Sequence, residues 1–332
     1  MNHGQSGPHN PPHLTSLAVT VRRGEFWLAG DSQRESDGTR QVAPAFVQWE
    51  ALAEGLPPQM IFVHGGGGQS TDWLGYGPAQ GWARHAVRRG WAAYLLDRPG
   101  HGRSTYDENR MGSRTPVPTY EQAAALFLGD DSCWPWNRDA PRDNLPPRAF
   151  SGPIDALVAS ADGMPTNTAW MQRQDAARLT DLLDVIGPSV LVTHSAGAAA
   201  GWIAALSRPG LVRAVISVEP LGPPDRDMGE RGALTYGVAA TPLPPLKPGT
   251  PPPSVYVLTG SGSGRVDIDA KTTDRLSTLG LSATQIILSE HGLPGHGHGL
   301  VFEAGNDRVF DLVLKTLADI AITATSTDRI AT

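Results

Sequence analysis

Four short segments of the chain carry residue types that can act together on an acyl compound. A serine hydroxyl becomes a nucleophile when a histidine takes its proton and a carboxylate orients that histidine. Backbone N–H groups of small residues can hold the oxyanion that then forms. The segments, in chain order, are His64-Gly65-Gly66-Gly67-Gly68, Thr193-His194-Ser195-Ala196-Gly197, Glu219-Pro220 and Gly295-His296-Gly297-His298. Their order of serine, acid and histidine predicts serine-based acyl transfer.

The predicted nucleophile, Ser195, lies where a strand is expected to give way to a helix. It comes directly after the apolar run 189–192 and before the small-residue stretch 196–205. This placement predicts a nucleophile elbow, the tight turn that holds a serine hydroxyl clear of the backbone. Thr193 replaces the usual first glycine of G-x-S-x-G, so the interpretation depends on the other three segments.

The glycine run after the expected strand 60–63 is the candidate for oxyanion binding. Without side chains, its backbone can approach a substrate, so we assign one N–H donor to Gly66, with Gly67 as the second choice. The other donor is expected from Ala196, next to the serine. Phosphate binding is the poorer interpretation because no Gly-Lys-Ser/Thr follows the glycines. His64 is expected to shape this loop by hydrogen bonding.

The base that activates Ser195 should come late in the chain, where His291, His296 and His298 lie within one loop. We predict His298, because it directly precedes the last helical run. His291 abuts the end of a strand, and His296 is expected to face solvent. Zinc binding by the three histidines is the alternative, although zinc ligands are usually held on regular elements. His194 is expected to pack beneath the elbow.

Glu219 is the predicted acid of the site. It ends the apolar run 214–218 and is followed by Pro220, so its carboxylate should lie at the carboxyl edge of the sheet, where active sites of open α/β sheets form. Asp267 and Asp269 are the rivals, since they follow a later strand end. A structural salt bridge is the other interpretation of Glu219.

Composition limits the classes of protein and partner. The chain has 332 residues, 40% of them hydrophobic, which suits one large core with insertions. The net charge is -6 and the basic residues are scattered, so nucleic acid is not an expected partner. An apolar run of about 18 residues is missing, so no membrane span is expected. The sequence does not indicate an oligomeric state.

The N-terminus and the single cysteine bear on the compartment. Residues 1–14 are rich in His, Pro, Asn and Gly and lack the apolar region of a signal peptide. We expect a flexible tail and a cytoplasmic protein. Cys133 excludes an internal disulfide and fits a reducing compartment. It is not a convincing nucleophile, because no strand-to-helix turn surrounds it.

Hydrophobic periodicity predicts alternating strands and helices. Residues 15–30 and 44–50 are expected to form early antiparallel strands joined by a polar loop over 31–40. Further strands are expected at 60–63, 91–96, 189–192, 211–218, 254–259 and 284–289, and helices at 81–89, 175–186, 196–207, 270–279 and 303–320. This alternation predicts an α/β fold with a mostly parallel, doubly wound sheet and helices on both faces.

Two proline-rich stretches, 105–170 and 221–253, interrupt that alternation, and we expect them to be cap or lid insertions over the active site. The prediction is one domain over 15–332. Two sets of side chains have alternative roles. Trp73, Trp134, Trp136 and Trp170 could line an aromatic pocket or pack in the core, and Arg98 and Arg138 could meet an anionic substrate or stay solvated.

Several of these motifs resemble those of the α/β-hydrolase superfamily. Within it, the chain is similar to a bacterial and fungal esterase-like group with a histidine-serine elbow, a glutamate followed by proline, and a late Gly-x-Gly-His. The matching segments are His194-Ser195, 219–224 and 295–298, together with the loop 97–104 as a marker of the fold. The resemblance implies Glu219 as the triad acid. The four glycines also resemble the oxyanion loop of hormone-sensitive-lipase-like esterases.

The expected activity is hydrolysis of a small carboxylic ester or lactone through an acyl-enzyme on Ser195. No metal and no organic cofactor is expected. Amide or carbon–carbon bond hydrolysis on the same residues is an alternative. A noncatalytic binding protein with the hydrolase fold is another, and the complete set of Ser195, His298 and Glu219 argues against it.

Overall fold

The computed structural model describes residues 19–76, 80–127 and 153–328. Cys133, Trp134, Trp136, Arg138 and the predicted N-terminal tail lie outside these residues. Within the described ranges, no helix combines the length and the hydrophobicity needed to cross a membrane.

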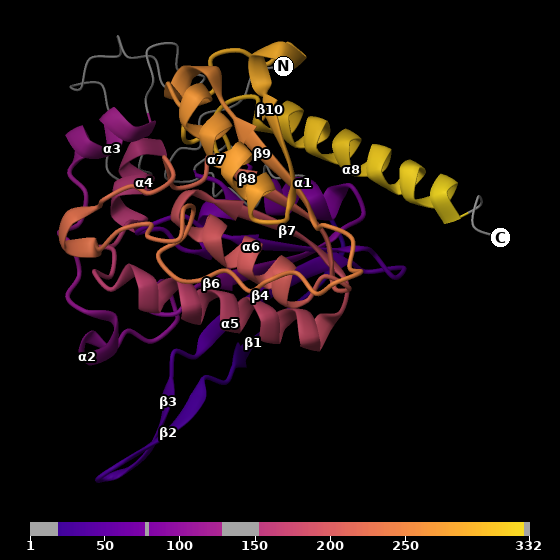
Figure 1. Cartoon of the computed structure of the whole chain (residues 1–332). Helices are drawn as coiled ribbons and strands as arrows, with labels where there is room; N and C mark the ends of the chain where they lie inside the picture. The colour runs from indigo at the N-terminus through magenta and orange to yellow at the C-terminus, as the bar shows by residue number, and fades with distance from the viewer. Residues whose placement is uncertain (1–18, 77–79, 128–152, 329–332) are drawn as a thin grey trace.

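The main sheet is mostly parallel, as predicted (Figure 1). Its eight strands, in spatial order, are β1 (Val21–Leu28), β4 (Ala45–Leu52), β6 (Ala92–Asp97), β5 (Gln59–Val63), β7 (Ser189–His194), β8 (Val212–Val218), β9 (Ser254–Thr259) and β10 (Ser282–Ile287). The first two pairings, β1 with β4 and β4 with β6, are antiparallel, and all the others are parallel.

The expected polar loop over 31–40 is wrong, because these residues form a hairpin. β2 (Asp31–Glu35) pairs antiparallel with β3 (Gly38–Val42), and Figure 1 shows the hairpin projecting from the body of the protein. Across its turn, Arg40 donates to Asp37 at 2.6 and 2.5 Å. Nearly all its side chains are exposed, so the alternation of apolar and polar residues that marks a half-buried strand is missing.

In the described part of the chain, five helices flank the sheet: α1 (Trp82–Arg88), α5 (Thr168–Ile186), α6 (Ala198–Ser207), α7 (Val266–Thr278) and α8 (Asn306–Asp328). α5 begins well before the predicted start at residue 175. The Asn167 side chain caps it by accepting a hydrogen bond from the Trp170 N–H at 3.2 Å, and the mixed polar residues of its first turns hide the helical period. The described residues of the first insertion include α2 (Glu108–Met111), α3 (Tyr120–Phe127) and α4 (Pro153–Ser160).

Each face of the sheet has its own apolar core. In β5, Met60 and Phe62 pack on the side of α1 and α8, whereas Ile61 and Val63 pack on the side of α5 and α6. Successive strand residues point to opposite faces, so a strand covered on both sides must be apolar throughout. Figure 1 shows α5 and α8 at opposite sides of the molecule. The prediction of helices on both faces is therefore confirmed.

Gly201 brings α6 close to the strand that carries Ser195. A Cβ added there would lie 2.8 Å from Thr193 Cγ2 and 3.2 Å from Val215 Cγ1. We expect Gly201→Val to lower the free energy of unfolding by about 1–3 kcal/mol, the usual cost of overpacking. Gly210→Val is the control, because nothing lies within 4 Å of an added Cβ at that position. Equal midpoints of urea unfolding for the two variants would contradict this close packing.

Candidate active site

Ser195 occupies the tight turn between β7 and α6. Its φ is +50°, in the left-handed region that costs a non-glycine residue energy, and it begins a 3₁₀ turn over Ser195–Gly197. A Cβ at Gly197 would lie 2.4 Å from the His64 carbonyl oxygen, so only glycine permits this approach of the turn to the glycine loop. The local geometry is that of a nucleophile elbow.

A chain of hydrogen bonds links the three predicted catalytic side chains. His298 Nε2 lies 3.1 Å from Ser195 Oγ, and His298 Nδ1 lies 2.8 Å from Glu219 Oε2. Because the ionised Glu219 carboxylate can only accept, Nδ1 donates to it, and Nε2 is left to accept the serine proton. Ser195 is half-buried, whereas His298 and Glu219 are buried.

Other donors fix the Glu219 carboxylate in place. Its Oε1 accepts hydrogen bonds from the Gly260 N–H at 2.9 Å and from the Ser263 hydroxyl at 2.6 Å. Arg265 Nε lies 3.7 Å from Oε2. These contacts come from the loop after β9, which holds the carboxylate in the orientation that meets His298.

The rival carboxylates do not contact His298. Asp269 is buried, but its oxygens accept from Thr259 Oγ1 at 2.9 Å and from Arg265 at 3.0 Å. Asp267 is exposed in the first turn of α7. Glu219 is therefore the carboxylate in hydrogen-bond contact with the histidine, and Asp269 supports the arginine beside it.

The other histidines near the site are not part of the hydrogen-bond chain from Ser195 to Glu219. His296 was expected to face solvent, and this is wrong: it is buried, and its Nδ1 lies 3.0 Å from Glu303 Oε2. His291 is exposed. His194 packs beneath the site, with Nε2 3.0 Å from the His298 carbonyl oxygen. Nowhere in the described ranges do three His, Cys, Asp or Glu side chains gather as a set of metal ligands.

Burial controls the charges of the linked pair. Together with the smaller effect of the nearby Arg265, it lowers the pKa of His298 to about 3, so the imidazole is neutral and can accept a proton. Burial also raises the pKa of Glu219 to about 7, against the opposing effects of Ser263, Arg265 and the Gly260 N–H. Glu219 orients His298 in its ionised form, by accepting a hydrogen bond from His298 Nδ1. We therefore expect Glu219 to lose its ability to orient His298 as the pH falls below about 7.

The glycine loop lies directly beside the elbow. A Cβ at Gly66 would lie 3.3 Å from the Ala196 Cβ, so the two residues chosen as oxyanion donors are neighbours. It would also lie 2.3 Å from Met164 Sδ, so a side chain at this position would have to displace Met164. Gly67 has a φ of +67°, and its carbonyl accepts from the Asp162 N–H. Gly66, rather than Gly67, lines the pocket next to Ala196.

Arg98 stabilises this loop from behind. Solvation was the expected alternative to substrate binding, but Arg98 is buried and pairs with Asp175 at 2.8 Å. It also donates to the Gly65 carbonyl at 2.8 Å, and its backbone N–H donates to His64 Nε2 at 3.1 Å. His64 therefore does shape the loop. Trp73 is buried in the core, whereas Trp170 is half-buried in the first turn of α5.

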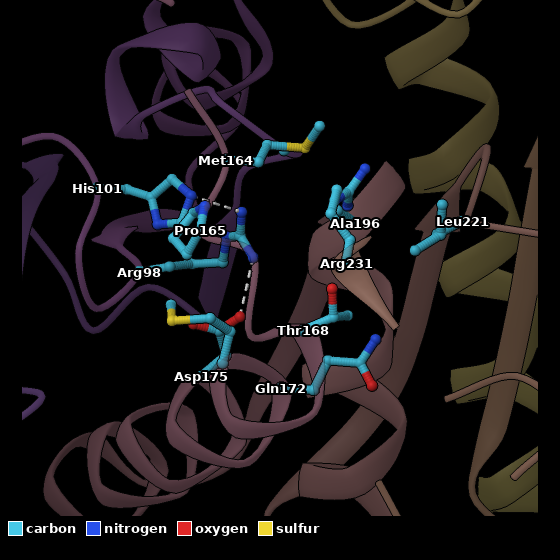
Figure 2. A pocket seen from close by; sticks show the side chains of 12 residues that line it. Arg98, His101, Met164, Pro165, Thr168, Gln172, Asp175, Ala196, Leu221 and Arg231 are labelled. Atoms are coloured by element: carbon cyan, nitrogen blue, oxygen red, sulfur yellow. Dashed lines mark hydrogen bonds and ion pairs between the residues drawn. The ribbon is translucent and has the colours of Figure 1, made fainter. Parts of the chain in front are cut away.

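A narrow pocket opens beside the elbow, and both predicted insertions contribute to it (Figure 2). Gly66 and Ala196, which are neighbours, both line it. The stretches 105–170 and 221–253 also contribute lining residues. Arg98 and Asp175 lie across from Ala196. In addition, the Phe127 ring lies 5.5 Å from the His298 ring, centroid to centroid. The described residues named here therefore place parts of both insertions against the site.

Ser263 gives a test of the electrostatics. Ser263→Ala removes a hydrogen bond that lowers the pKa of Glu219, so the acid limb of kcat/KM should move to higher pH by about one unit. Ser261→Ala is the control, because that hydroxyl accepts from the Gly295 N–H rather than contacting Glu219. The measurement is the pH profile for hydrolysis of 4-nitrophenyl acetate. A limb that moves to lower pH, or equally in both variants, would contradict this role of Ser263.

The sequence did not single out several residues that complete the site. Ser263 and Arg265 support Glu219, and Thr168 and Arg231 line the pocket. The glycine-rich run 260–264 directly after β9 was a usable indication for the first two. Thr168 and Arg231 lie in or next to irregular stretches, where no periodicity shows the direction of a side chain.

Comparison with known proteins agrees with this architecture. The sequence model of the alpha/beta hydrolase fold matches residues 58–241. A probable secreted lipase of a fungal species (strain ATCC 74256) is 24% identical over 295 residues, which are 78% of this chain and 81% of the lipase. The structure of a bacterial esterase superposes with a TM-score of 0.64 at 20% identity, covering 92% of this chain and 98% of the esterase. Since the family model spans more than half of the chain, the protein belongs to the alpha/beta hydrolase fold family.

Proposed function

We propose that the protein hydrolyses carboxylic esters through an acyl-enzyme on Ser195. The observation that carries this proposal is the continuous hydrogen-bond chain from Ser195 through His298 to Glu219, beside Gly66 and Ala196. The similarity to a probable secreted lipase supports an ester as the substrate.

In the first half-reaction, His298 Nε2 takes the proton of Ser195 Oγ while that oxygen attacks the ester carbonyl. The carbonyl oxygen becomes an anion, which the N–H groups of Gly66 and Ala196 stabilise, typically by about 3–4 kcal/mol for each donor. The protonated His298 then gives its proton to the leaving alcohol. An acyl-enzyme and a free alcohol result.

In the second half-reaction, His298 takes a proton from water, whose oxygen attacks the acyl carbonyl. Collapse of this second oxyanion returns the proton to Ser195 Oγ and releases the carboxylic acid. Glu219 remains an anion throughout and keeps Nδ1 of His298 in the donor state. Overall, one ester and one water give one carboxylic acid and one alcohol. The side chains named here need no metal or cofactor for these steps.

Pre-steady-state hydrolysis of 4-nitrophenyl acetate tests the proposal. When deacylation is the slower step, an acyl-enzyme produces a burst of 4-nitrophenol equal to the concentration of active sites. We expect such a burst, or linear turnover if acylation is slower, and loss of both in His298→Ala. A protein that binds the ester and never releases 4-nitrophenol would instead support the noncatalytic alternative. Lactones and anilides in the same assay distinguish lactonase from amidase activity.

A further inference from the structure

The pocket beside Ala196 is small and lined by both apolar and polar residues. Its volume is about 30 Å³, enough for a few atoms of a substrate and too little for a long acyl chain. Its walls carry the polar side chains of Arg98, Thr168, Asp175 and Arg231 (Figure 2). A pocket of this size, with polar side chains set among apolar ones, can hold a short chain that ends in a polar group.

The two arginines differ in their pairing. Arg98 is neutralised by Asp175 at 2.8 Å. The Arg231 guanidinium has neither an ion pair nor a hydrogen bond among the described residues, and its buried Nε lacks a partner. Burial lowers the pKa of Arg231, and the positive charges of Arg226 and Arg98 add to this effect. Glu230 lies on the same 3₁₀ turn, over Gly229–Arg231, but is not within ion-pairing distance. The pocket therefore has one uncompensated positive charge.

A second donor lies at the same place. Thr168 is buried, and its hydroxyl has no hydrogen-bond partner in the described part of the chain. Burying an unpaired hydroxyl or the unpaired Nε–H of a guanidinium costs free energy that a bound anion would recover. Both Thr168 and Arg231 also line a larger, more open hollow next to the pocket. A ligand can therefore approach them from solvent.

The position of the pocket relative to His298 indicates which part of a substrate enters it. This assignment of the pocket to one part of the substrate rests on the proposed ester hydrolysis. The leaving alcohol must lie near His298, which gives it a proton. The pocket is lined by Gly66 and Ala196, the oxyanion donors, and by no residue of the loop 290–300. It therefore lies on the acyl side of the scissile bond.

We propose that Arg231 and Thr168 bind a carboxylate at the far end of the acyl group, so that the preferred substrates are monoesters of short dicarboxylic acids. A carboxylate accepts several hydrogen bonds at once, and an arginine paired with it gives a strong, oriented contact. One net positive charge matches one carboxylate better than a doubly charged phosphate monoester. The small volume limits the chain between the two carbonyl carbons to a few atoms.

Matched esters test this specificity. The probes are the monomethyl esters of succinic, glutaric and adipic acid, each compared with the ester in which a primary amide replaces the free carboxylate. The two members of a pair have nearly the same size and differ in charge. We expect at least one pair in which the carboxylate ester has a kcat/KM about tenfold higher or more, the value of one charged hydrogen bond.

Variants assign the preference to Arg231. In Arg231→Gln, the ratio of kcat/KM for the carboxylate ester to that for the amide ester should fall about tenfold or more, to near one. Arg231→Lys should retain part of it. Arg213→Gln is the matched control, because Arg213 is exposed at the start of β8, and its ratio should equal that of the wild type. Glutarate should also inhibit the hydrolysis of 4-nitrophenyl acetate in the wild type and not in Arg231→Gln.

The outcomes separate this proposal from the one on which it rests. If the wild type hydrolyses the amide esters as well as the carboxylate esters in all three pairs, the carboxylate site is refuted and the esterase stands. The same holds if Arg231→Gln keeps the wild-type ratio. If the wild type hydrolyses neither these esters nor 4-nitrophenyl acetate, the ester hydrolase itself is refuted, and the substrate class with it.

Discussion

Replacing Ser195 by alanine should lower kcat/KM for 4-nitrophenyl acetate by about 10⁴- to 10⁶-fold, the range seen when a nucleophile that acts as a unit with its base is removed. Ser195 Oγ is the atom 3.1 Å from His298 Nε2, and no other hydroxyl contacts that nitrogen in the described ranges. The fold should survive, because the small alanine side chain fits wherever the half-buried serine did.

Ser261→Ala is the control for this loss. Ser261 is exposed, and its hydroxyl accepts from a backbone N–H of the loop that carries His298, so the variant perturbs the same region without touching the proposed nucleophile. Steady-state rates for both variants, together with urea unfolding, separate loss of chemistry from loss of fold. A Ser195→Ala protein with more than a tenth of the wild-type kcat/KM would refute the assigned nucleophile.

Glu219→Gln should have the second largest effect, a loss of about 10³- to 10⁴-fold in kcat/KM, because an amide in place of the carboxylate can hold His298 in the wrong tautomer. His298 Nδ1, which lies 2.8 Å from the carboxylate in the wild type, would then face either the amide oxygen, a weaker acceptor, or the amide NH₂, a donor. Glutamine keeps the size of the side chain and can still accept from Gly260 and Ser263. The measurement is the rate of 4-nitrophenyl acetate hydrolysis near pH 8, where Glu219 is ionised in the wild type.

Asp269→Asn and Asp267→Asn provide the comparison. Asp267 is exposed, so its variant should match the wild type in rate and stability. Asp269 is buried beside Arg265, so its variant is expected to lose stability and only part of its rate. If Glu219→Gln keeps activity while Asp269→Asn stays folded and loses it, the acid has been assigned to the wrong strand end.

Much of the site could be predicted because it lies at the ends of regular elements. The apolar run before Ser195 and the run before Glu219 each form a strand, and the carboxyl ends of parallel strands meet at one edge of the sheet. The chain order then limited the histidine to one loop. Contact between His298 and the other two residues is a property of the structure, while its catalytic role stays a prediction until a variant is tested.

The errors in the prediction occur where contacts distant in sequence outweigh local pattern. His296 has a polar side chain in a glycine-rich loop, and it is buried because Glu303 accepts its hydrogen bond. Arg98 is buried because Asp175 lies beside it, although the two are far apart in the chain. The hairpin over 31–42 has exposed side chains on both faces and therefore no apolar period to detect. The cytoplasmic location and the absence of a cofactor stay predictions.

The most direct test of the central claim is peptide mapping by mass spectrometry after treatment with a fluorophosphonate, which phosphonylates an activated serine regardless of the natural substrate. We predict one adduct, on the peptide that contains Ser195, and loss of that adduct in His298→Ala. A folded wild-type protein that remains unlabelled, or that is labelled on another serine, would contradict the account of Ser195 as a nucleophile activated by His298.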